Sequence, residues 1–270
     1  MAAKSIGILC YSPTNTTRRV CTAVAFGMGS QSPRVLDMTL PRSREEIVAG
    51  SKKTLDDIDH LVVGAPVYAG KLPRQAMECL TTVHGSGKDC TAIVVYGNRD
   101  YGIALRAMVE TLSRNNFTVV AAATFIGQHS YSDIIPVAMG RPDKSDIEKA
   151  RVFGTKVLSA SRPLGVKDVP VQIDYFTKSD RYFELKPSYD QEMCVECGKC
   201  AAVCPLGLLG SEGGGYPSQD ARKLCSGCMA CVRNCEHKAR VAKANPMVKM
   251  FMASILRRAS KERKEPVMVV

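Results

Sequence analysis

A repeated cysteine spacing in the last third of the chain constrains its fold more than any other feature. Eight of the twelve cysteines lie between Cys194 and Cys235. They form two runs with the same spacing: Cys194, Cys197, Cys200 and Cys204, then Cys225, Cys228, Cys231 and Cys235. The N-terminal residues lack the long apolar segment of a secretory signal, so we expect metal ligation rather than disulfide formation.

This spacing separates two kinds of metal site. A structural zinc site usually takes two well-separated cysteine pairs in a tetrahedron. Three cysteines at two-residue intervals fit one face of a [4Fe–4S] cubane, and a fourth cysteine three residues later points towards a second cluster. We therefore predict one cluster on Cys194, Cys197, Cys200 and Cys235, and another on Cys225, Cys228, Cys231 and Cys204. Zinc is the alternative interpretation.

Small residues inside the two runs support the cluster interpretation, because they let the backbone approach sulfur closely and point N–H groups at it. They are Gly198, Ala201, Gly227 and Ala230. Over residues 191–242 the sequence resembles the bacterial two-cluster ferredoxins. It departs from their pattern at Glu236, which stands where proline usually follows the second run, and in its longer spacer between the runs.

Residues 1–160 alternate between apolar runs and amphipathic segments. The apolar runs predict strands at 5–10, 34–37, 60–65, 92–96 and 119–126, and the amphipathic segments predict helices at 18–28, 74–83, 103–114 and 144–161. Continuous apolar strands separated by helices indicate a parallel sheet that is covered on both faces. We predict an α/β fold with a doubly wound, five-stranded parallel sheet, followed by a small α+β ferredoxin-like domain.

A hydroxyl-rich loop follows the first predicted strand and leads into a helix. Its candidate phosphate-binding residues are Ser12, Thr14, Asn15, Thr16 and Thr17. Hydroxyls and backbone N–H groups at a helix N-terminus bind phosphate without a lysine. The loop matches neither the P-loop nor the dinucleotide-binding glycine pattern. A cluster of N-capping residues is the alternative interpretation.

Two further strand ends carry candidate ligand-binding residues, since open α/β sheets bind ligands at the carboxyl ends of their strands. They are Pro66, Val67, Tyr68, Ala69, Gly70 and Lys71 after the third strand, and Gly97, Asn98, Arg99 and Tyr101 after the fourth. Tyr68 and Tyr101 can stack on a flavin ring, although ordinary packing is the alternative for each. The main chain of Gly97 and Asn98 can hydrogen-bond the pyrimidine edge of that ring.

These three loops resemble those of the flavodoxins, which bind FMN at the switch point of a 2-1-3-4-5 sheet. Asn15 stands where glycine is usual, and asparagine tolerates the left-handed backbone region. Together with the cysteine runs, the sequence is similar to the flavodoxin–ferredoxin fusion family, found mostly in anaerobes. That resemblance implies FMN and two [4Fe–4S] clusters as cofactors.

The expected division of the chain has four parts. These are a flavodoxin-like domain at 1–160, a linker at 161–190, the two-cluster domain at 191–242, and a basic amphipathic helix and tail at 243–270. The segment 125–132 also resembles the fusion family and is expected near the flavin. His129 within it is a candidate proton donor, partner contact or structural hydrogen-bonding group, and we favour the last two.

The net charge of +11 invites a nucleic-acid interpretation. Two clusters at about −2 each and a phosphate at about −1.5 to −2 bring the loaded protein to roughly +5. No groove-reading motif is present, and no apolar run reaches the roughly 18 residues of a membrane span.

The apolar stripe of the C-terminal segment predicts docking on the protein's own body, with an acidic partner or an anionic membrane surface as the alternative.

These features predict a cytoplasmic electron-transfer protein that passes electrons between its clusters and FMN, and links a low-potential donor to a partner oxidoreductase. The alternative is a flavin-dependent reductase of a small molecule, fed by its own ferredoxin domain. A nucleic-acid-binding or metal-sensing protein that uses the clusters structurally is a third, less favoured hypothesis. Whether the chain is itself an enzyme stays open from the sequence.

Overall fold

The N-terminal part of the chain forms a parallel β-sheet. The computed structural model describes residues 5–270 except 51–53, 161, 173–184, 211–214 and 216–217. The parallel strands lie in the order β2-β1-β3-β4-β5. Their bounds are β1 Ile6–Cys10, β2 Arg34–Asp37, β3 His60–Pro66, β4 Asp89–Tyr96 and β5 Thr118–Ile126. The predicted doubly wound sheet is confirmed, and its strand order is that of the flavodoxin-like fold.

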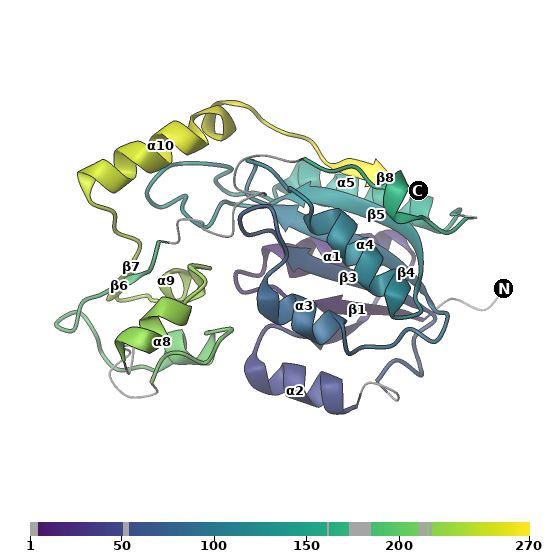
Figure 1. Cartoon of the computed structure of the whole chain (residues 1–270), viewed down its shortest axis with the longest axis horizontal. Coiled ribbons are helices and arrows are strands. Elements are labelled where there is room, and N and C mark those ends of the chain that lie inside the picture. The colour runs from purple at the N-terminus through teal and green to yellow at the C-terminus, as the bar shows by residue number, and fades with distance from the viewer. Residues whose placement is uncertain (1–4, 51–53, 161, 173–184, 211–214, 216–217) are drawn as a thin grey trace.

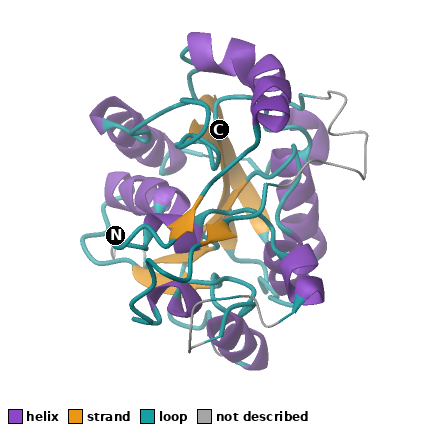
Figure 2. Ribbon diagram, turned by 90° about the vertical axis from the view of Figure 1, so that its left-hand side faces the viewer, coloured by secondary structure: helices purple, strands orange, loops and turns teal. Residues whose placement is uncertain are grey.

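Helices cover both faces of this sheet (Figure 2). One core cluster packs α1 (Thr16–Gly27) and α5 (Lys144–Val157) on one face. The other packs α2 (Pro41–Ala49), α3 (Arg74–Leu80) and α4 (Ala104–Arg114) on the opposite face. The sequence pattern missed α2, because this short, highly charged helix buries only Ile47 in the core.

The C-terminus returns to the sheet as a sixth strand. Strand β8 (Val267–Val269) pairs antiparallel with β5, and the backbone N–H of Val267 also donates to the hydroxyl of Thr124 at 3.1 Å. Residues 243–270 therefore contain, besides the expected helix, a strand that the sequence did not predict. The pairing covers the backbone groups of an edge strand that would otherwise be open to other chains.

Part of the expected linker also belongs to the first core. Leu164 and Val169 are buried there, flanking a short 3-10 helix at Val166–Asp168. The N–H of Leu164 donates to the carbonyl of Val119 at 2.7 Å. Residues 161 and 173–184 of that linker lie outside the described residues, so the expected boundary at 190 remains a prediction.

The cysteine-rich region forms a small α+β unit beside the sheet (Figure 1). It contains the antiparallel pair β6 (Ser188–Tyr189) and β7 (Arg240–Val241), with short helices α7 (Lys199–Ala202), α8 (Gln219–Leu224) and α9 (Ala230–Arg233). Helix α10 (Pro246–Lys261) then leads from this unit back towards the sheet. None of the helices in the described part of the chain is long and apolar enough to span a membrane.

A buried ion pair holds the segment after α10 against the first domain. The side chains of Arg141 and Asp146 are 5% and 0% exposed, and Arg141 Nε donates to Asp146 Oδ2 at 2.8 Å. Arg141 Nη1 donates to the carbonyl of Lys264 at 2.9 Å. Arg263 adds a half-exposed ion pair with Asp143 at 2.8 Å. The carboxylate of Asp146 therefore neutralises the cation that anchors the returning chain.

We predict that Asp146→Ala destabilises the protein by about 3–5 kcal/mol, because it leaves the Arg141 cation buried without its carboxylate. Glu46→Ala, which breaks an exposed pair with Arg42, should cost at most about 1 kcal/mol. Chemical denaturation followed by circular dichroism measures both. Equal losses in the two variants would show that the buried pair does not anchor the returning segment.

Candidate functional site

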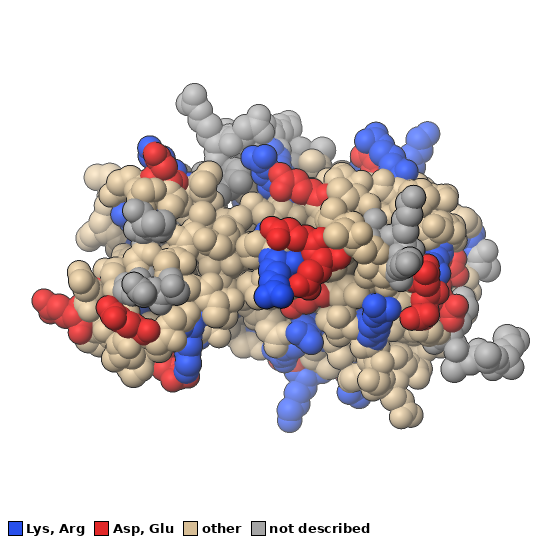
Figure 3. All heavy atoms as spheres, turned by 90° about the horizontal axis from the view of Figure 1, so that it is seen from below, with Lys and Arg blue, Asp and Glu red and all other residues tan. Residues whose placement is uncertain are grey.

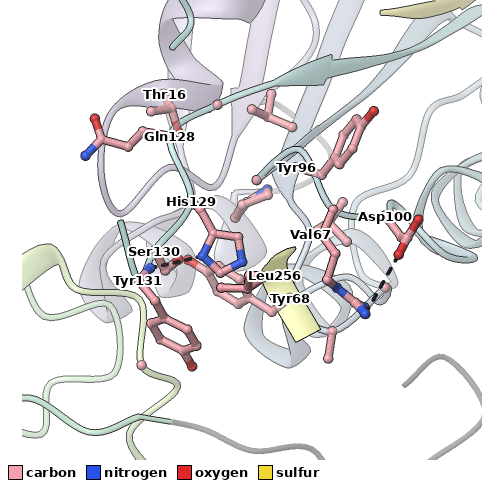
Figure 4. Close-up of a pocket in the computed structure, with 18 of the residues that line it drawn as sticks. Thr16, Val67, Tyr68, Tyr96, Asp100, Gln128, His129, Ser130, Tyr131 and Leu256 are labelled. Atoms are coloured by element: carbon pink, nitrogen blue, oxygen red, sulfur yellow. Dashed lines mark hydrogen bonds and ion pairs between the residues drawn. The ribbon is translucent and has the colours of Figure 1, made fainter. Parts of the chain in front are cut away.

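A cleft of about 150 Å³ lies at the carboxyl ends of the parallel strands (Figure 4). Nine of the predicted cofactor-binding residues line it. They are Thr14, Thr16, Pro66, Val67, Tyr68, Ala69, Gly70, Gly97 and Arg99. The three loops predicted at separate strand ends therefore meet at one site, as the parallel topology requires.

The first of these loops has the geometry of an anion-binding helix start. Asn15 takes the left-handed conformation, with φ 62°, directly before α1. The hydroxyl of Ser12 accepts from the N–H of Arg18 at 3.0 Å, so this side chain already has a hydrogen-bond partner within the loop. The hydroxyl of Thr17 is buried and finds no hydrogen-bond partner among the described residues. A phosphate at this helix start would supply the missing partner, so the loop fits the FMN phosphate.

Ser12, Asn15 and Thr17 shape the loop but do not line the cleft, and Lys71 lies outside the lining as well. The backbones of Lys71 and Tyr68 hydrogen-bond each other at 2.9 and 3.0 Å. That pairing closes the tight turn through Ala69 and Gly70, both of which have positive φ. The side chain of Tyr68 stays at the cleft, in one of the positions from which an aromatic ring can contact a flavin.

Two predicted residues serve packing instead of lining the cleft. Tyr101 is 3% exposed and packs edge-on against Tyr96, with ring centroids 5.6 Å apart. The side-chain amide of Asn98 donates to the carbonyls of Ala259 at 2.8 Å and Glu262 at 2.6 Å. Of the two tyrosines expected to stack on a flavin, only Tyr68 lines the cleft, and Asn98 holds the end of α10.

Several lining residues were missed by the sequence prediction. Helix α10 contributes Met252, Ile255 and Leu256. Met252 and Leu256 are buried, and Leu256 packs with Val137. The apolar stripe of this segment was a usable signal, and the structure shows it docked on the protein's own body. Phe251, next to Met252 on this helix, is half-exposed and lies outside the buried face.

The second cysteine run also reaches the cleft. Ser226 and Gly227, between the first two cysteines of that run, line it together with the loop that contains His129. Spacing alone gave no signal for this contact, because it depends on how the two units pack.

His129 projects into the cleft (Figure 4). Its Nδ1 accepts from the backbone N–H of Tyr131 at 3.1 Å, which places the proton of the neutral ring on Nε2. Burial, together with the nearby Arg99 and Arg233 cations, lowers the pKa of His129 to about 4. The ring is therefore neutral at physiological pH and a poor proton donor through protonated imidazole.

The eight cysteines of the two runs line two separate cavities. Cys194, Cys197, Cys200 and Cys235 line one. Cys204, Cys225, Cys228 and Cys231 line the other. Each cavity holds three cysteines of one run and the last cysteine of the other, the same sets that the sequence assigns to the two clusters.

The surroundings of the second cavity fit an iron–sulfur cluster. Ser226 Oγ and Arg233 Nε are buried without a hydrogen-bond partner among the described residues, and Ser226 lines this cavity. Cluster sulfurs accept such hydrogen bonds.

Charges of both signs share the surface. On the face shown in Figure 3, Lys and Arg lie among Asp and Glu and do not form one continuous basic field. Independently of this view, Arg18 pairs with Asp37 at 3.8 Å and Lys199 with Glu236 at 2.6 Å in the described part of the chain. The net charge of +11 is therefore distributed and not concentrated on this face.

Comparison with known proteins gives two separate matches. Residues 186–241 match the 4Fe-4S dicluster domain family. The pyruvate synthase subunit PorD of Methanocaldococcus jannaschii is 31% identical over 58 residues, which are 22% of this chain and 66% of that protein. PorD of Methanothermobacter marburgensis is 29% identical over 62 residues, 23% of this chain and 70% of that protein.

Among solved structures, a flavodoxin from the domain Archaea aligns with 57% of this chain and 96% of its own, at 17% identity and a TM-score of 0.40. Flavodoxin 1 from Bacillus cereus aligns with 57% of this chain and 97% of its own, also at 17% identity and a TM-score of 0.40. The strand order, rather than these low scores, establishes the fold of the N-terminal part. The chain thus joins a flavodoxin-like fold to a 4Fe-4S dicluster domain, and this combination supports an electron-transfer role.

The lowered pKa of His129 predicts a specific dependence of stability on pH. Below pH 6.5 an unfolded chain binds a proton at this ring that the folded chain does not bind. Stability should therefore fall as the pH drops from about 6.5 to about 4, by up to about 3 kcal/mol from this residue.

His129→Gln should remove that part of the pH dependence, while His84→Gln, at an exposed position, should follow the unmodified protein. Thermal unfolding midpoints measured across this pH range test the prediction. Parallel curves for the unmodified protein and His129→Gln would contradict it.

Proposed function

We propose that this fusion of a flavodoxin-like fold with a 4Fe-4S dicluster domain binds FMN and two [4Fe–4S] clusters, and carries electrons between a low-potential donor and a partner oxidoreductase. Cubane clusters exchange one electron at a time, and FMN accepts one or two. Having these groups in one chain replaces diffusive encounters between separate carriers by a tethered arrangement. The observation that carries the proposal is the pair of four-cysteine cavities beside a cleft at the sheet's carboxyl edge.

The cleft residues have distinct roles in this proposal. The loop before α1 would bind the phosphate through the N–H groups of the first helical turn and the hydroxyls of Thr16 and Thr17. Tyr68 and the Ala69–Gly70 turn would contact the ring, while Gly97 and Arg99 would contact its far edge. The apolar side chains of Met252 and Leu256 would exclude water from the outer side of the cleft.

The cysteines have crossed roles. Cys194, Cys197, Cys200 and Cys235 would hold one cluster, and Cys225, Cys228, Cys231 and Cys204 the other. Backbone N–H groups already point at cysteine sulfurs in the described residues, from Glu196 to Cys194 and from Leu208 to Cys204, both at 3.4 Å. Such contacts stabilise the negative charge on cluster ligands.

The alternative function, a reductase acting on a small molecule at the flavin, is less favoured. It requires a proton donor at the cleft. His129 is held neutral by a pKa of about 4, which leaves a tyrosine such as Tyr68 as the donor that this alternative would have to use. Turnover of a small molecule with dithionite as reductant and no partner protein would favour this alternative.

Anaerobically purified protein should contain about eight irons, about eight labile sulfides and one FMN per chain, because each cubane holds four of each. Iron, sulfide and flavin analyses measure this composition. Four irons, or zinc in place of iron, would reject the assignment of both clusters.

Cys204→Ser tests the crossed arrangement. The substitution should perturb the electron paramagnetic resonance signal of the cluster that the second run mainly forms, because Cys204 lies in that cavity. Cys235→Ser is the matched variant and should perturb the other cluster. Perturbation of each run's own cluster would show that the ligands are not exchanged.

Thr17→Val should weaken FMN binding without lowering the stability of the flavin-free protein. Its buried hydroxyl has no partner among the described residues, so the variant should be no less stable than the original protein when both are free of flavin. A hydrogen bond from this hydroxyl to the phosphate is worth about 1.5–3 kcal/mol, so FMN should bind at least about tenfold more weakly. Fluorescence titration measures affinity, with Thr22→Val as the control on the same helix. Unchanged affinity would place the phosphate elsewhere.

A further inference from the structure

We propose that the two cluster sites have different neighbours and that Gly227 is the residue that sets this difference. The inner site is the cavity of Cys204, Cys225, Cys228 and Cys231, and the outer site is the cavity of Cys194, Cys197, Cys200 and Cys235. The inner site adjoins the flavin cleft, and the outer site faces solvent. This inference rests on the proposed function, because it concerns where the proposed cofactors lie relative to each other.

The first observation is a shared wall. Ser226 and Gly227 line the flavin cleft, and Ser226 also lines the inner site. A single segment of chain, the one between Cys225 and Cys228, therefore lies between the cleft and the inner site. No residue between Cys194 and Cys200, all of them described, lines the cleft.

The second observation is a comparison between the two runs. Gly227 and Glu196 occupy the same place, directly before the second cysteine of each run, and have φ of 63° and 54°. A non-glycine residue thus adopts this turn in the outer site, so the backbone conformation alone does not require glycine. A Cβ at Gly227 would lie 2.8 Å from the carbonyl oxygen of Leu185 and 3.2 Å from the hydroxyl of Tyr131. Glycine at 227 is therefore explained by how closely the second cysteine run, at Cys225–Cys228, approaches the cleft wall.

Two hydrogen bonds hold that approach in place. Arg233 Nη2, at the end of the helix α9 that contains Cys231, donates to the carbonyl of His129 at 3.1 Å. The hydroxyl of Tyr131 accepts from the N–H of Leu185 at 3.1 Å. His129 and Tyr131 both line the cleft, so one bond joins the cysteine-rich unit to the cleft wall, and the other joins that wall to Leu185, whose carbonyl lies next to Gly227.

The third observation is the difference in exposure. Cys228 and Cys231 in the inner site are each 8% exposed, whereas Cys197 in the outer site is open to solvent. Met193 and Val195, next to the outer ligands, are 50% and 57% exposed. The outer site is thus the one with the more exposed ligand set, and a donor or acceptor protein can approach it without entering the cleft.

Flavin fluorescence tests this order without a partner protein. A nearby cluster quenches an excited flavin by accepting or donating an electron. Cys228→Ser, which removes an inner ligand, should lengthen the flavin fluorescence lifetime severalfold. Cys197→Ser, which removes an outer ligand, should leave it near that of the loaded original protein.

Gly227→Ala tests the positioning role, and Glu196→Ala is its matched control. Gly227→Ala should keep the iron and FMN content but lengthen the flavin fluorescence lifetime. The added Cβ pushes the second cysteine run away from Leu185 and Tyr131. Glu196→Ala replaces one side chain by another at the equivalent turn and should leave the lifetime unchanged. Gly227→Ser should behave like Gly227→Ala, which covers the case in which one variant fails to assemble.

The outcomes separate this inference from the proposed function. Original protein that binds no iron or no FMN would refute the proposed function. Fully loaded original protein with equal lifetimes in Cys228→Ser and Cys197→Ser, or a longer lifetime only in Cys197→Ser, would overturn the inner and outer assignment alone. An unchanged lifetime in a fully loaded Gly227→Ala would overturn the role of Gly227.

Discussion

The return of the C-terminal strand to the sheet is the constraint on which the rest of the arrangement depends. Residues 162–172 leave the first domain packed against β5 and α4, and β8 comes back to pair with β5. The cysteine-rich unit is therefore held at both ends by the same sheet, with the buried Arg141–Asp146 pair locking the returning segment. A unit tied twice explores far less space than one on a single linker, so it can keep a close contact such as that of Gly227 with the cleft wall.

The elements that the sequence predicted are those with strong local signals. Strands β1, β3, β4 and β5 are almost wholly buried and read as apolar runs. The cysteine spacing assigned the same two sets that the cavities contain. What it missed depends on tertiary packing. Strand β8 is three residues long, and only its pairing with β5 makes it a strand. Asn98 and Tyr101 follow a strand at the correct edge, but whether a side chain there turns to the cleft or to a neighbouring helix is decided by what packs beside it.

Electrostatics at the cleft favour a negatively charged occupant. Arg99 lines the cleft and Arg233 reaches its wall, and both cations depress the pKa of His129. The same two charges would stabilise an anionic flavin and, through Arg233, would act on the inner site, where Cys228 lies. A neutral histidine between two arginines adds no further positive charge, so it can hold the loop in place without repelling either guanidinium.

The walls of the cleft give it two different sides. On one side lies the cysteine-rich unit, through Ser226 and Gly227, and on another lies α10, through Met252, Ile255 and Leu256. Asn98 ties the end of α10 to the strand end that it covers, so the apolar wall and the sheet are fixed to each other. The α10 wall is apolar, whereas the wall at Gly227 adjoins the inner cysteine site. Apolar side chains disfavour water on one side, and the other side would bring a flavin bound in the cleft next to a cluster bound by the same chain, which suits the proposed exchange of electrons within one chain.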